Sequence, residues 1–344
     1  MLHDLIHATL KKKPEIESKL IDVEKEIDGS FISSKWIKTN FRENRVSIVA
    51  EDGSYNAKKY RTFVLYAISS TAIILKNRIT SRKFIDVDVI EPTYYFEEKL
   101  KLRMTLAELE MLYKTLNEFN PELALIDGSL IGEIIRPLYT EEELDKLRKE
   151  GVKHNFLPDI ENSLGKEILF MKKKENELEK SVLDFAEYIE YLDALYHLLK
   201  DYGSRLVAIS KTSSSSSMFE MRFSDIMLFE RFASGEGHSL PYHFKAKEKI
   251  KRGIPLHEHF FKELDFTIFY LRLGENTNVL KIEVPRHIKE DEIVSIAEKL
   301  KAISVDGYPY LLKKAHEETV IKNRYIEKIA QILGIVDRTG REML

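Results

Sequence analysis

The stretch LALIDGS at residues 123–129 is a short apolar run that ends in the tripeptide Asp-Gly-Ser. A wholly apolar run of this length fits a strand that is buried on both faces of a sheet. The earlier stretch RVSIVAEDGS, at residues 45–54, has the same design, because alternating β-branched residues lead into a second Asp-Gly-Ser. We interpret its EDGS sequence as a turn that directly follows a strand.

The segments between these two stretches predict how they are connected. Tyr60–Ser69 and Thr71–Leu75 are strand-like, and Phe84–Ile90 alternates cleanly, so these segments and the first stretch predict an antiparallel meander. Lys99–Phe119 carries a stripe of leucines at helical spacing and ends near Asn120-Pro121, which predicts a crossover helix. Three meander strands, a crossover helix and a buried strand together predict an α/β fold.

The remainder of the chain predicts a helical insertion, more strands and closing helices. Glu141–Tyr202 has a helical pattern and is interpreted as an inserted helical arm. Arg205–Ser210 predicts another buried strand leading to Lys211, and the serine run at 213–217 is typical of a loop. Further strands are predicted at Asp225–Phe229, Phe266–Leu273 and Val279–Val284, and helices at Lys289–Ile303 and Pro309–Leu333.

The chain divides into three predicted parts. Residues 1–40 form an N-terminal helical arm, because apolar residues recur at helical spacing over residues 2–28, as in a packing or dimer arm. Residues 41–334 form one main domain, with the helical insertion around 141–202. Residues 335–344 form a C-terminal tail.

The composition excludes several classes of protein. Of the 344 residues, 43% are hydrophobic and 32% are charged, which excludes an intrinsically disordered chain. The longest apolar stretches, such as Phe63–Leu75, fall short of the ~20 residues that a bilayer requires. The N-terminus lacks the pattern of a secretory signal, so we expect a cytoplasmic protein without membrane association.

One glutamine beside 54 basic and 57 acidic residues indicates a heat-adapted protein. The net charge of −3 gives no overall attraction to a polyanion, so a nucleic acid would require a local basic lining.

The absence of cysteine excludes disulfides, thiolate nucleophiles and cysteine-bound zinc, so any metal ion must be held by Asp, Glu or His.

Asp52 and Asp127 each follow an apolar run, and on neighbouring strands their carboxylates would lie within reach of a shared ion. Alternatively, each Asp-Gly is only a favoured turn dipeptide. On the predicted helix, Glu108 lies on a partly apolar face, whereas Glu110 neighbours Lys114 and is expected to be solvated.

Asp52, Glu108 and Asp127 would form an oxygen-rich pocket that suits Mg²⁺ or Mn²⁺. Two such ions about 4 Å apart would generate hydroxide and stabilise the leaving oxygen, which predicts phosphodiester hydrolysis. The alternative for Glu108 is a side chain at the rim of the pocket that extends into solvent.

Four other residues could complete such a site. Lys211, at the end of its strand, either holds a scissile phosphate or is simply solvated. Asp225, in FSDIML, is either a cap or a fourth metal ligand. In DGYPYLLKKAH, at residues 306–316, Pro309 begins a helix that leaves Tyr308 exposed and places His316 two turns along. His316 would ligate a metal or position water, unless it is an ordinary core residue.

Histidines and basic clusters elsewhere carry weaker signals. The triplet His257-Glu258-His259 has i, i+2 spacing in a loop, and we assign it no metal. The clusters Lys172–Lys174 and Lys245–Arg252 would support contacts with a phosphate backbone, although charge runs are usually solvated faces.

Taken together, these motifs resemble those of the NurA nucleases, archaeal enzymes that resect DNA ends. The resemblance spans residues 45–320, and its elements occur in the expected order. The matching elements are EDGSYN around Asp52, RMTLAELEML around Glu108, LIDGSL around Asp127, AISKTSSS around Lys211, FSDIML around Asp225, and DGYPYLLKKAH ending in His316.

The resemblance implies an RNase H-like mixed sheet with flanking helices and an inserted helical arm. It also implies a Mn²⁺-dependent nuclease that acts as a single-strand endonuclease and as a 5′ to 3′ exonuclease on single- and double-stranded DNA during end resection. The implied partners are a second copy of the chain, in a ring-like homodimer, and the hexameric HerA ATPase.

The resemblance also assigns roles to residues. Asp52, Glu108 and Asp127 would be the acidic ligands, with His316 and Asp225 completing the metal site, and Lys211 and Tyr308 would contact the substrate. Glu108 and Glu110 compete for one of these roles. Two alternatives remain: a catalytically silent adaptor of a DNA-translocating ATPase, and an RNase H-like ribonuclease.

Overall fold

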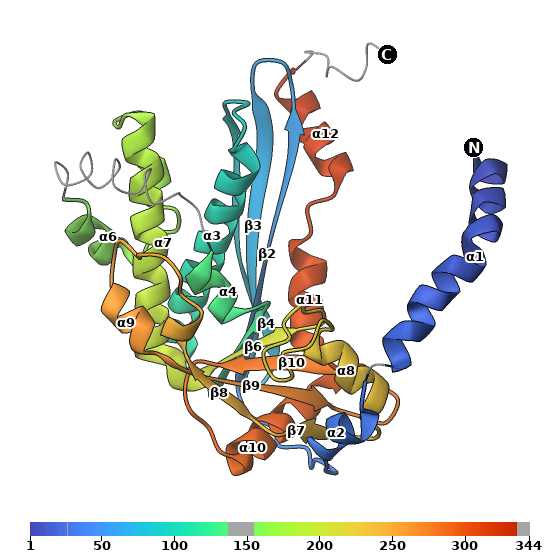
Figure 1. Ribbon diagram of the computed structural model, residues 1–344. Coiled ribbons are helices and arrows are strands. Elements are labelled where there is room, and N and C mark those ends of the chain that lie inside the picture. The colour runs from blue at the N-terminus through green and yellow to red at the C-terminus, as the bar shows by residue number, and fades with distance from the viewer. Residues whose placement is uncertain (26, 137–154, 336–344) are drawn as a thin grey trace.

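The computed structural model describes residues 1–25, 27–136 and 155–335, and a mixed sheet lies at its centre (Figure 1). Within these residues the sheet has ten strands in the order β1-β7-β9-β10-β6-β5-β2-β3-β4, with β8 paired to β9. The strands are β1 Trp36–Lys38, β2 Ile48–Lys59, β3 Val64–Leu75, β4 Ile79–Ile90, β5 Leu123–Asp127, β6 Leu206–Ser210, β7 Gly237–Ser239, β8 Tyr242–Lys245, β9 Asp265–Arg272 and β10 Leu280–Val284. A separate short pair consists of β11 Ser304–Val305 and β12 Tyr308–Pro309.

The half of the sheet from β4 to β6 has RNase H-like topology. β2, β3 and β4 form an antiparallel meander, the helix α3 (Phe96–Phe119) crosses over, and β5 returns parallel to β2. β6 then pairs parallel to β5. The predicted meander, crossover helix and buried strands are therefore confirmed, and so is the RNase H-like α/β class.

Helices cover both faces of this sheet. On one face, α3 packs with α7 (Lys180–Tyr202), and on the other face lie α10 (Glu290–Lys301) and α11 (Tyr310–Thr319). Successive residues of a strand point to opposite faces. Val49 accordingly belongs to the α3 core and Ala50 to the α11 core. Continuing this alternation, Asp52 faces α11 and Gly53 faces α3.

A buried ion pair fixes the crossover helix against α7. Arg103 of α3 donates hydrogen bonds of 2.6 and 3.0 Å to Glu187 and one of 2.7 Å to the hydroxyl of Tyr66 on β3, and neither charged side chain is exposed to solvent by more than 1%. Removing one partner of such a pair leaves a buried charge without compensation. The pair therefore holds α3, and with it Glu108, in one position over the sheet.

The remaining helices lie around this core. They are α1 Leu2–Lys25, α2 Gly29–Ser34, α4 Leu130–Ile135, α6 Leu157–Ser163, α8 Asp225–Phe232, α9 Glu258–Glu263 and α12 Asn323–Ile332, with 3₁₀ turns at Met171–Lys174, Gly203–Arg205 and Ala246–Glu248. Figure 1 shows α1 extending away from the body, which agrees with the predicted N-terminal helix. The described helices include none that is both long and apolar enough to span a membrane. The predicted helix at 141–154 and most of the predicted tail lie outside the described residues.

Three predictions about local structure were wrong. EDGS is not a turn, because β2 continues through it and pairs residue by residue with β3 as far as Lys59. The long ladder to β3 overrides the turn preference of Asp-Gly. Asp225–Phe229 is helical rather than extended, since a short apolar run fits either structure. Pro309–Leu333 forms two helices, α11 and α12, rather than one.

Candidate active site

Asp52 and Asp127 lie side by side on the parallel strands β2 and β5. The register pairs Glu51 with Ile126, so the two aspartates occupy the next position on each strand. Ala50 and Leu125, two residues earlier, both belong to the core on the α11 side, so both aspartates face α11. The negative charge of Asp127 contributes to raising the pKa of Asp52, although burial of the Asp52 carboxyl is the largest cause.

α11 brings a histidine to Asp52. The Nδ1 atom of His316 lies 2.8 Å from Oδ2 of Asp52, and one turn along the helix the hydroxyl of Thr319 donates to the Asp52 backbone carbonyl at 3.1 Å. The His316 hydrogen bond opposes the rise in the pKa of Asp52 that burial causes. His316 is 57% exposed, so its ring contacts the aspartate and is also accessible to solvent.

A lysine and a tyrosine meet at Asp127. Lys211, the residue after β6, lies 3.1 Å from Oδ2 of Asp127, and the hydroxyl of Tyr308 donates to the same oxygen at 3.4 Å. The Lys211 ammonium also lies 4.4 Å from the centre of the Tyr308 ring. Burial and the charge of Asp127 raise the pKa of Tyr308, so its hydroxyl stays protonated and can donate.

Glu108 approaches Asp52 from the opposite face of the sheet, at Gly53. A Cβ atom at Gly53 would lie only 2.1 Å from Oε1 of Glu108, and the Gly53 backbone N–H donates to the Glu108 carboxylate. Burial raises the pKa of Glu108 well above its usual value, and the charge of Asp52 raises it further. Gly53 is therefore required for the glutamate to lie against β2 next to Asp52.

Two more carboxyl groups near this centre were not anticipated. Glu51 is 2% exposed and accepts a hydrogen bond from Ser70 at 2.8 Å, while burial and the charge of Glu108 raise its pKa. Glu133 on α4 also raises the pKa of Glu108, whereas Arg136 lowers it. The only sequence signal for Glu51 was its place beside Asp52 in an apolar strand. The charges of neighbouring carboxyl groups thus contribute to the raised pKa values of Glu51, Asp52 and Glu108.

Glu110 has a structural position, and the prediction that it is solvated was wrong. It is 1% exposed, and its Oε2 accepts the Leu169 backbone N–H at 2.8 Å. Its neighbour Glu190 on α7 accepts the backbone N–H groups of Phe170 and Met171. Of the two helix glutamates, Glu108 and not Glu110 therefore lies beside Asp52.

The Glu110–Glu190 pair predicts a loss of stability at alkaline pH. Burial raises the pKa of Glu110 well above 4.5 and that of Glu190 to about 7. A buried carboxyl group with a raised pKa keeps its proton in the folded protein at a pH where the unfolded chain has lost it. Its contribution to stability is complete below the unfolded-state pKa and is lost as the pH rises through the folded-state pKa. We expect Glu110→Gln, which keeps a donor toward Glu190, to reduce the loss of unfolding free energy as the pH rises from about 5 to 8 by about 1–3 kcal/mol. Urea unfolding at each pH measures this, with Glu98→Gln, exposed on the same helix, as control. Equal pH slopes in the wild type and Glu110→Gln would contradict it.

Asp225 begins α8 and is 1% exposed. Its carboxylate accepts hydrogen bonds from the backbone N–H groups of Met218 and Phe219 and from the hydroxyl of Tyr270. These contacts hold the turn at Met218–Phe219 against the start of α8, whose N-cap residue is Ser224 and not Asp225. Among the described residues, Asp225 makes no hydrogen bond with Asp52 or Asp127.

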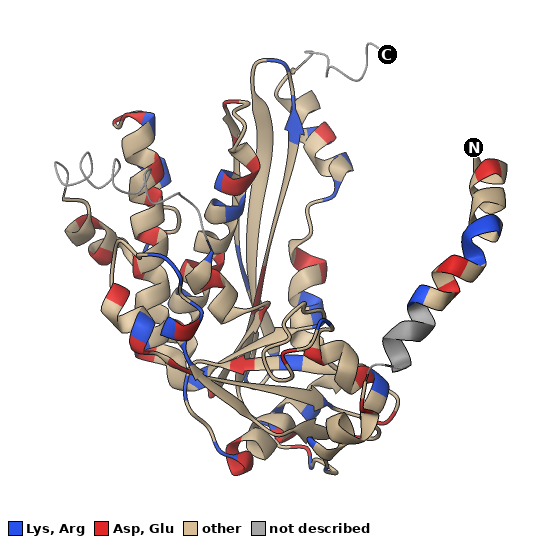
Figure 2. Ribbon diagram, viewed as in Figure 1, with Lys and Arg blue, Asp and Glu red and all other residues tan. Residues whose placement is uncertain are grey.

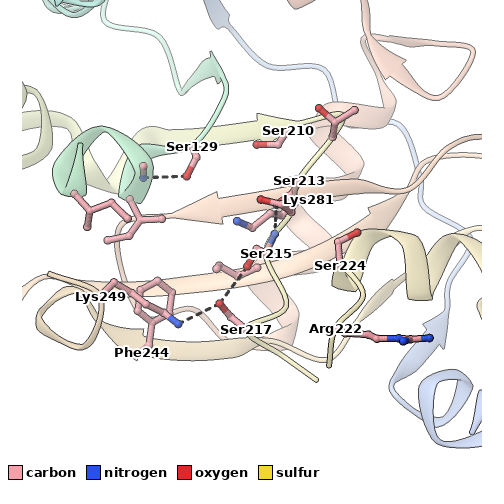
Figure 3. A pocket seen from close by; sticks show the side chains of 16 residues that line it. Ser129, Ser210, Ser213, Ser215, Ser217, Arg222, Ser224, Phe244, Lys249 and Lys281 are labelled. Carbon is pink, nitrogen blue, oxygen red and sulfur yellow. Dashed lines mark hydrogen bonds between the residues drawn. The ribbon is translucent and has the colours of Figure 1, made fainter. Parts of the chain in front are cut away.

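A serine-rich pocket of about 900 Å³ begins next to the aspartates. Ser129 and Ser210 line it, two residues after Asp127 and one residue before Lys211. Figure 3 shows the serine run, interpreted above only as a loop, along one side of this space, where Lys249 donates to Ser217 at 3.1 Å. The pocket is thus lined by serine hydroxyl groups, by the cations of Arg222, Lys249 and Lys281, and by apolar side chains.

The two basic clusters of the sequence are engaged in ion pairs. Lys172 lies 2.6 Å from Asp86 and 2.7 Å from Asp88, and both Lys245 and Lys247 pair with Glu263. Figure 2 shows basic and acidic segments interspersed over the ribbon. These three lysines are therefore partly neutralised, whereas Lys249 of the second cluster lines the serine-rich pocket.

The sheet order and the carboxylates that meet between β2 and β5 define an RNase H-like protein. The chain belongs to the NurA family, because the NurA domain model matches residues 46–321. It is 28% identical to a probable DNA double-strand break repair nuclease NurA of Methanocaldococcus jannaschii, covering 99% of this chain and 92% of the relative. It is also 28% identical to the DNA double-strand break repair nuclease NurA of Sulfurisphaera tokodaii, covering 97% and 96%.

Solved NurA structures share the fold. The NurA nuclease from Sulfolobus solfataricus superposes with a TM-score of 0.76 at 20% identity, covering 97% of both chains. A NurA crystal structure with dAMP and manganese superposes with a TM-score of 0.73 at 15% identity, covering 97% of this chain and 98% of that one.

Proposed function

We propose that the protein is a metal-dependent DNA nuclease that acts in the resection of DNA double-strand breaks. The proposal is supported by the position of Asp52, which lies beside Asp127 on the neighbouring strand and beside Glu108 of α3. The relatives named as double-strand break repair nucleases support DNA as the substrate. The finer activities that we propose are single-strand endonuclease and 5′ to 3′ exonuclease cleavage of single- and double-stranded DNA.

The residues of this centre fit a divalent cation. Asp52, Glu108 and Asp127 offer carboxylate oxygens, and the raised pKa values of Asp52 and Glu108 reflect burial and mutual repulsion that a cation would relieve. Oxygen donors suit Mn²⁺ and Mg²⁺, and the imidazole of His316 favours Mn²⁺ of the two. When bound, such ions lower the pKa of water and neutralise charge on the phosphate.

The other residues take roles that their contacts support. His316, hydrogen-bonded to Asp52 and accessible to solvent, orients the attacking water or gives a proton to the leaving oxygen. Lys211 and Tyr308, which now share Asp127, turn toward the scissile phosphate. We propose that Asp225 acts by holding the loop at Met218, not as a metal ligand.

We also propose that a strand of DNA enters along the serine-rich pocket, where hydroxyl groups donate to phosphate and sugar oxygens.

We place the protein in the cytoplasm as a homodimer that works with a HerA-type hexameric ATPase. Exposed Leu2, Ile6 and Leu10 on α1 would support such assembly, because this helix leaves them without a core to pack against.

The test is a cleavage assay on DNA labelled at either end, with Mn²⁺, Mg²⁺ or EDTA and with a matched RNA strand. We expect DNA cleavage that requires the metal, with short products released from the 5′ end. Cleavage of RNA alone would favour the ribonuclease alternative, and no cleavage of either strand would favour the silent adaptor.

Metal binding predicts a change in melting temperature. We expect saturating Mn²⁺ to raise the Tm of the chelator-treated protein by about 2–5 °C, because a ligand that binds only the folded state stabilises it. The double variant Asp52→Asn/Asp127→Asn should lose most of this shift, and differential scanning fluorimetry measures both. An unchanged Tm in the wild type would contradict a preformed cation site.

A further inference from the structure

A second cluster of metal-binding side chains lies in the helical insertion, on the α7 side of the molecule. Glu161 of α6 and Asp193 and His197 of α7 each offer a ligand atom, and these three atoms lie within 4.8 Å of one another. His257, immediately before α9, lies 3.1 Å from Oδ1 of Asp193 through its Nε2 atom. Figure 1 shows α6, α7 and α9 grouped together, so three segments far apart in the sequence meet here.

Asp193 is a buried carboxylate with too few hydrogen-bond partners. Its side chain is 0% exposed, and within the described part of the chain its Oδ2 atom has no hydrogen-bond partner. A buried carboxylate oxygen without a partner costs free energy, unless a cation or a proton compensates it. Burial accordingly raises the pKa of Asp193 to about 6.

Two histidines approach the other carboxylate oxygen of Asp193, at distances close to those between the ligands of one metal ion. Ligands of tetrahedral zinc lie about 3.3 Å apart, given metal–ligand distances of about 2.0–2.1 Å. The Nε2 atoms of His257 and His197 lie 3.1 and 3.7 Å from Oδ1 of Asp193. Burial lowers the pKa of His257, which favours the neutral imidazole that a metal ion requires.

The surroundings hold both rings in place. Nδ1 of His197 faces Asp201 at 3.7 Å, the kind of outer carboxylate that orients a metal-bound histidine. The ring of His257 stacks on Tyr196 at 3.7 Å between centroids, and its backbone has a φ of 54°, in the left-handed region. A non-glycine residue held in this region costs free energy and is commonest at functional sites.

We propose that Glu161, Asp193, His197 and His257 bind one structural Zn²⁺ ion that ties α6 and α9 to α7. Glu161, Asp193 and His197 already lie within 4.8 Å of one another, and His257, which contacts Asp193, would supply the fourth ligand of a tetrahedral ion. Imidazole selects Zn²⁺ over the harder ions that suit an all-carboxylate centre. The site is separate from the carboxylates of β2 and β5, since none of its four residues contacts them. The rival interpretation is an ordinary set of histidine–aspartate hydrogen bonds.

The test measures cobalt and zinc binding by the full chain carrying Asp52→Asn and Asp127→Asn, so that the first centre does not contribute. We expect one equivalent of Co²⁺ with the intense visible absorption of four-coordinate cobalt, displaced by Zn²⁺, and a Tm that rises with Zn²⁺. His197→Gln/His257→Gln, at positions about a fifth exposed, should weaken binding at least about 100-fold. His259→Gln, exposed two residues from His257, should bind as before.

Three results would overturn the proposal. The first is the absence of a cobalt absorption band in the parent chain at micromolar metal, and the second is a band typical of octahedral cobalt. The third is equal metal affinity in the parent chain and in the His197→Gln/His257→Gln chain. The first two use the parent chain alone, so a variant that fails to fold does not affect them.

Discussion

Replacing Asp52 or Asp127 with asparagine is expected to reduce DNA cleavage at least about 1,000-fold, because each carboxylate is proposed to hold the cation on which the chemistry depends. Asparagine keeps the shape of the side chain and removes its charge. Single-turnover cleavage of 5′-labelled DNA in Mn²⁺ measures the effect. Asp291→Asn, exposed at the start of α10, is the matched control and should cleave at the wild-type rate.

These two variants should also remain folded, which distinguishes a catalytic from a structural role. The pKa of Asp52 is raised chiefly by burial and also by the charge of Asp127, so the ionised pair opposes folding in the metal-free protein. Neutralising one member is therefore expected to leave the Tm unchanged or higher, because active sites commonly hold groups that lower the stability of the fold. A variant that melts much lower, or one that cleaves at full rate, would each refute the proposed role.

The sequence was informative wherever local pattern determines structure. The alternation of RVSIVA and the apolar run LALI predicted β2 and β5, and both aspartates follow in the register that the topology requires. Lys211 was likewise predicted from its position at a strand end. Such features depend on residues near each other in the chain, so they can be inferred without a structure.

Features that depend on the rotation of one element against another could not be inferred. Glu110 seemed solvated because Lys114 follows it on the helix, but α7 covers this face and brings Glu190 against it. Likewise, His257 lies in a loop with no helical spacing to indicate a ligand, and only the packing of α9 brings it to Asp193. In both cases, the decisive neighbour is more than 60 residues away.

Gly53 shows how a local signal can be misread and still mark the site. An Asp-Gly pair favours a turn, but here the glycine lies within β2, paired with Ser70. Its missing side chain is used by Glu108, whose Oε1 would lie 2.1 Å from an added Cβ. A glycine inside a strand often marks a close approach of another group.

Gly53→Ala is expected to reduce cleavage at least about 100-fold with little loss of stability. The atoms that an added methyl group meets are Oε1, Cδ and Cγ of Glu108 and not backbone atoms, so this side chain must rotate away from β2. The fold therefore tolerates the substitution, but the carboxylate leaves Asp52. Thermal melting and single-turnover cleavage measure the two effects. Gly203→Ala, whose added Cβ would lie 3.8 Å from its nearest neighbour, is the matched control.

A double-mutant cycle tests whether the effect acts through Glu108. If the methyl group acts only by displacing this carboxylate, Gly53→Ala should cost almost nothing further in a Glu108→Gln background, because the group that it displaces has already lost its charge. Full additivity of the two losses would show that Gly53 acts by another route, such as distortion of β2 at Asp52. Wild-type cleavage by Gly53→Ala would instead remove Glu108 from the centre, leaving the two aspartates as its only acidic ligands.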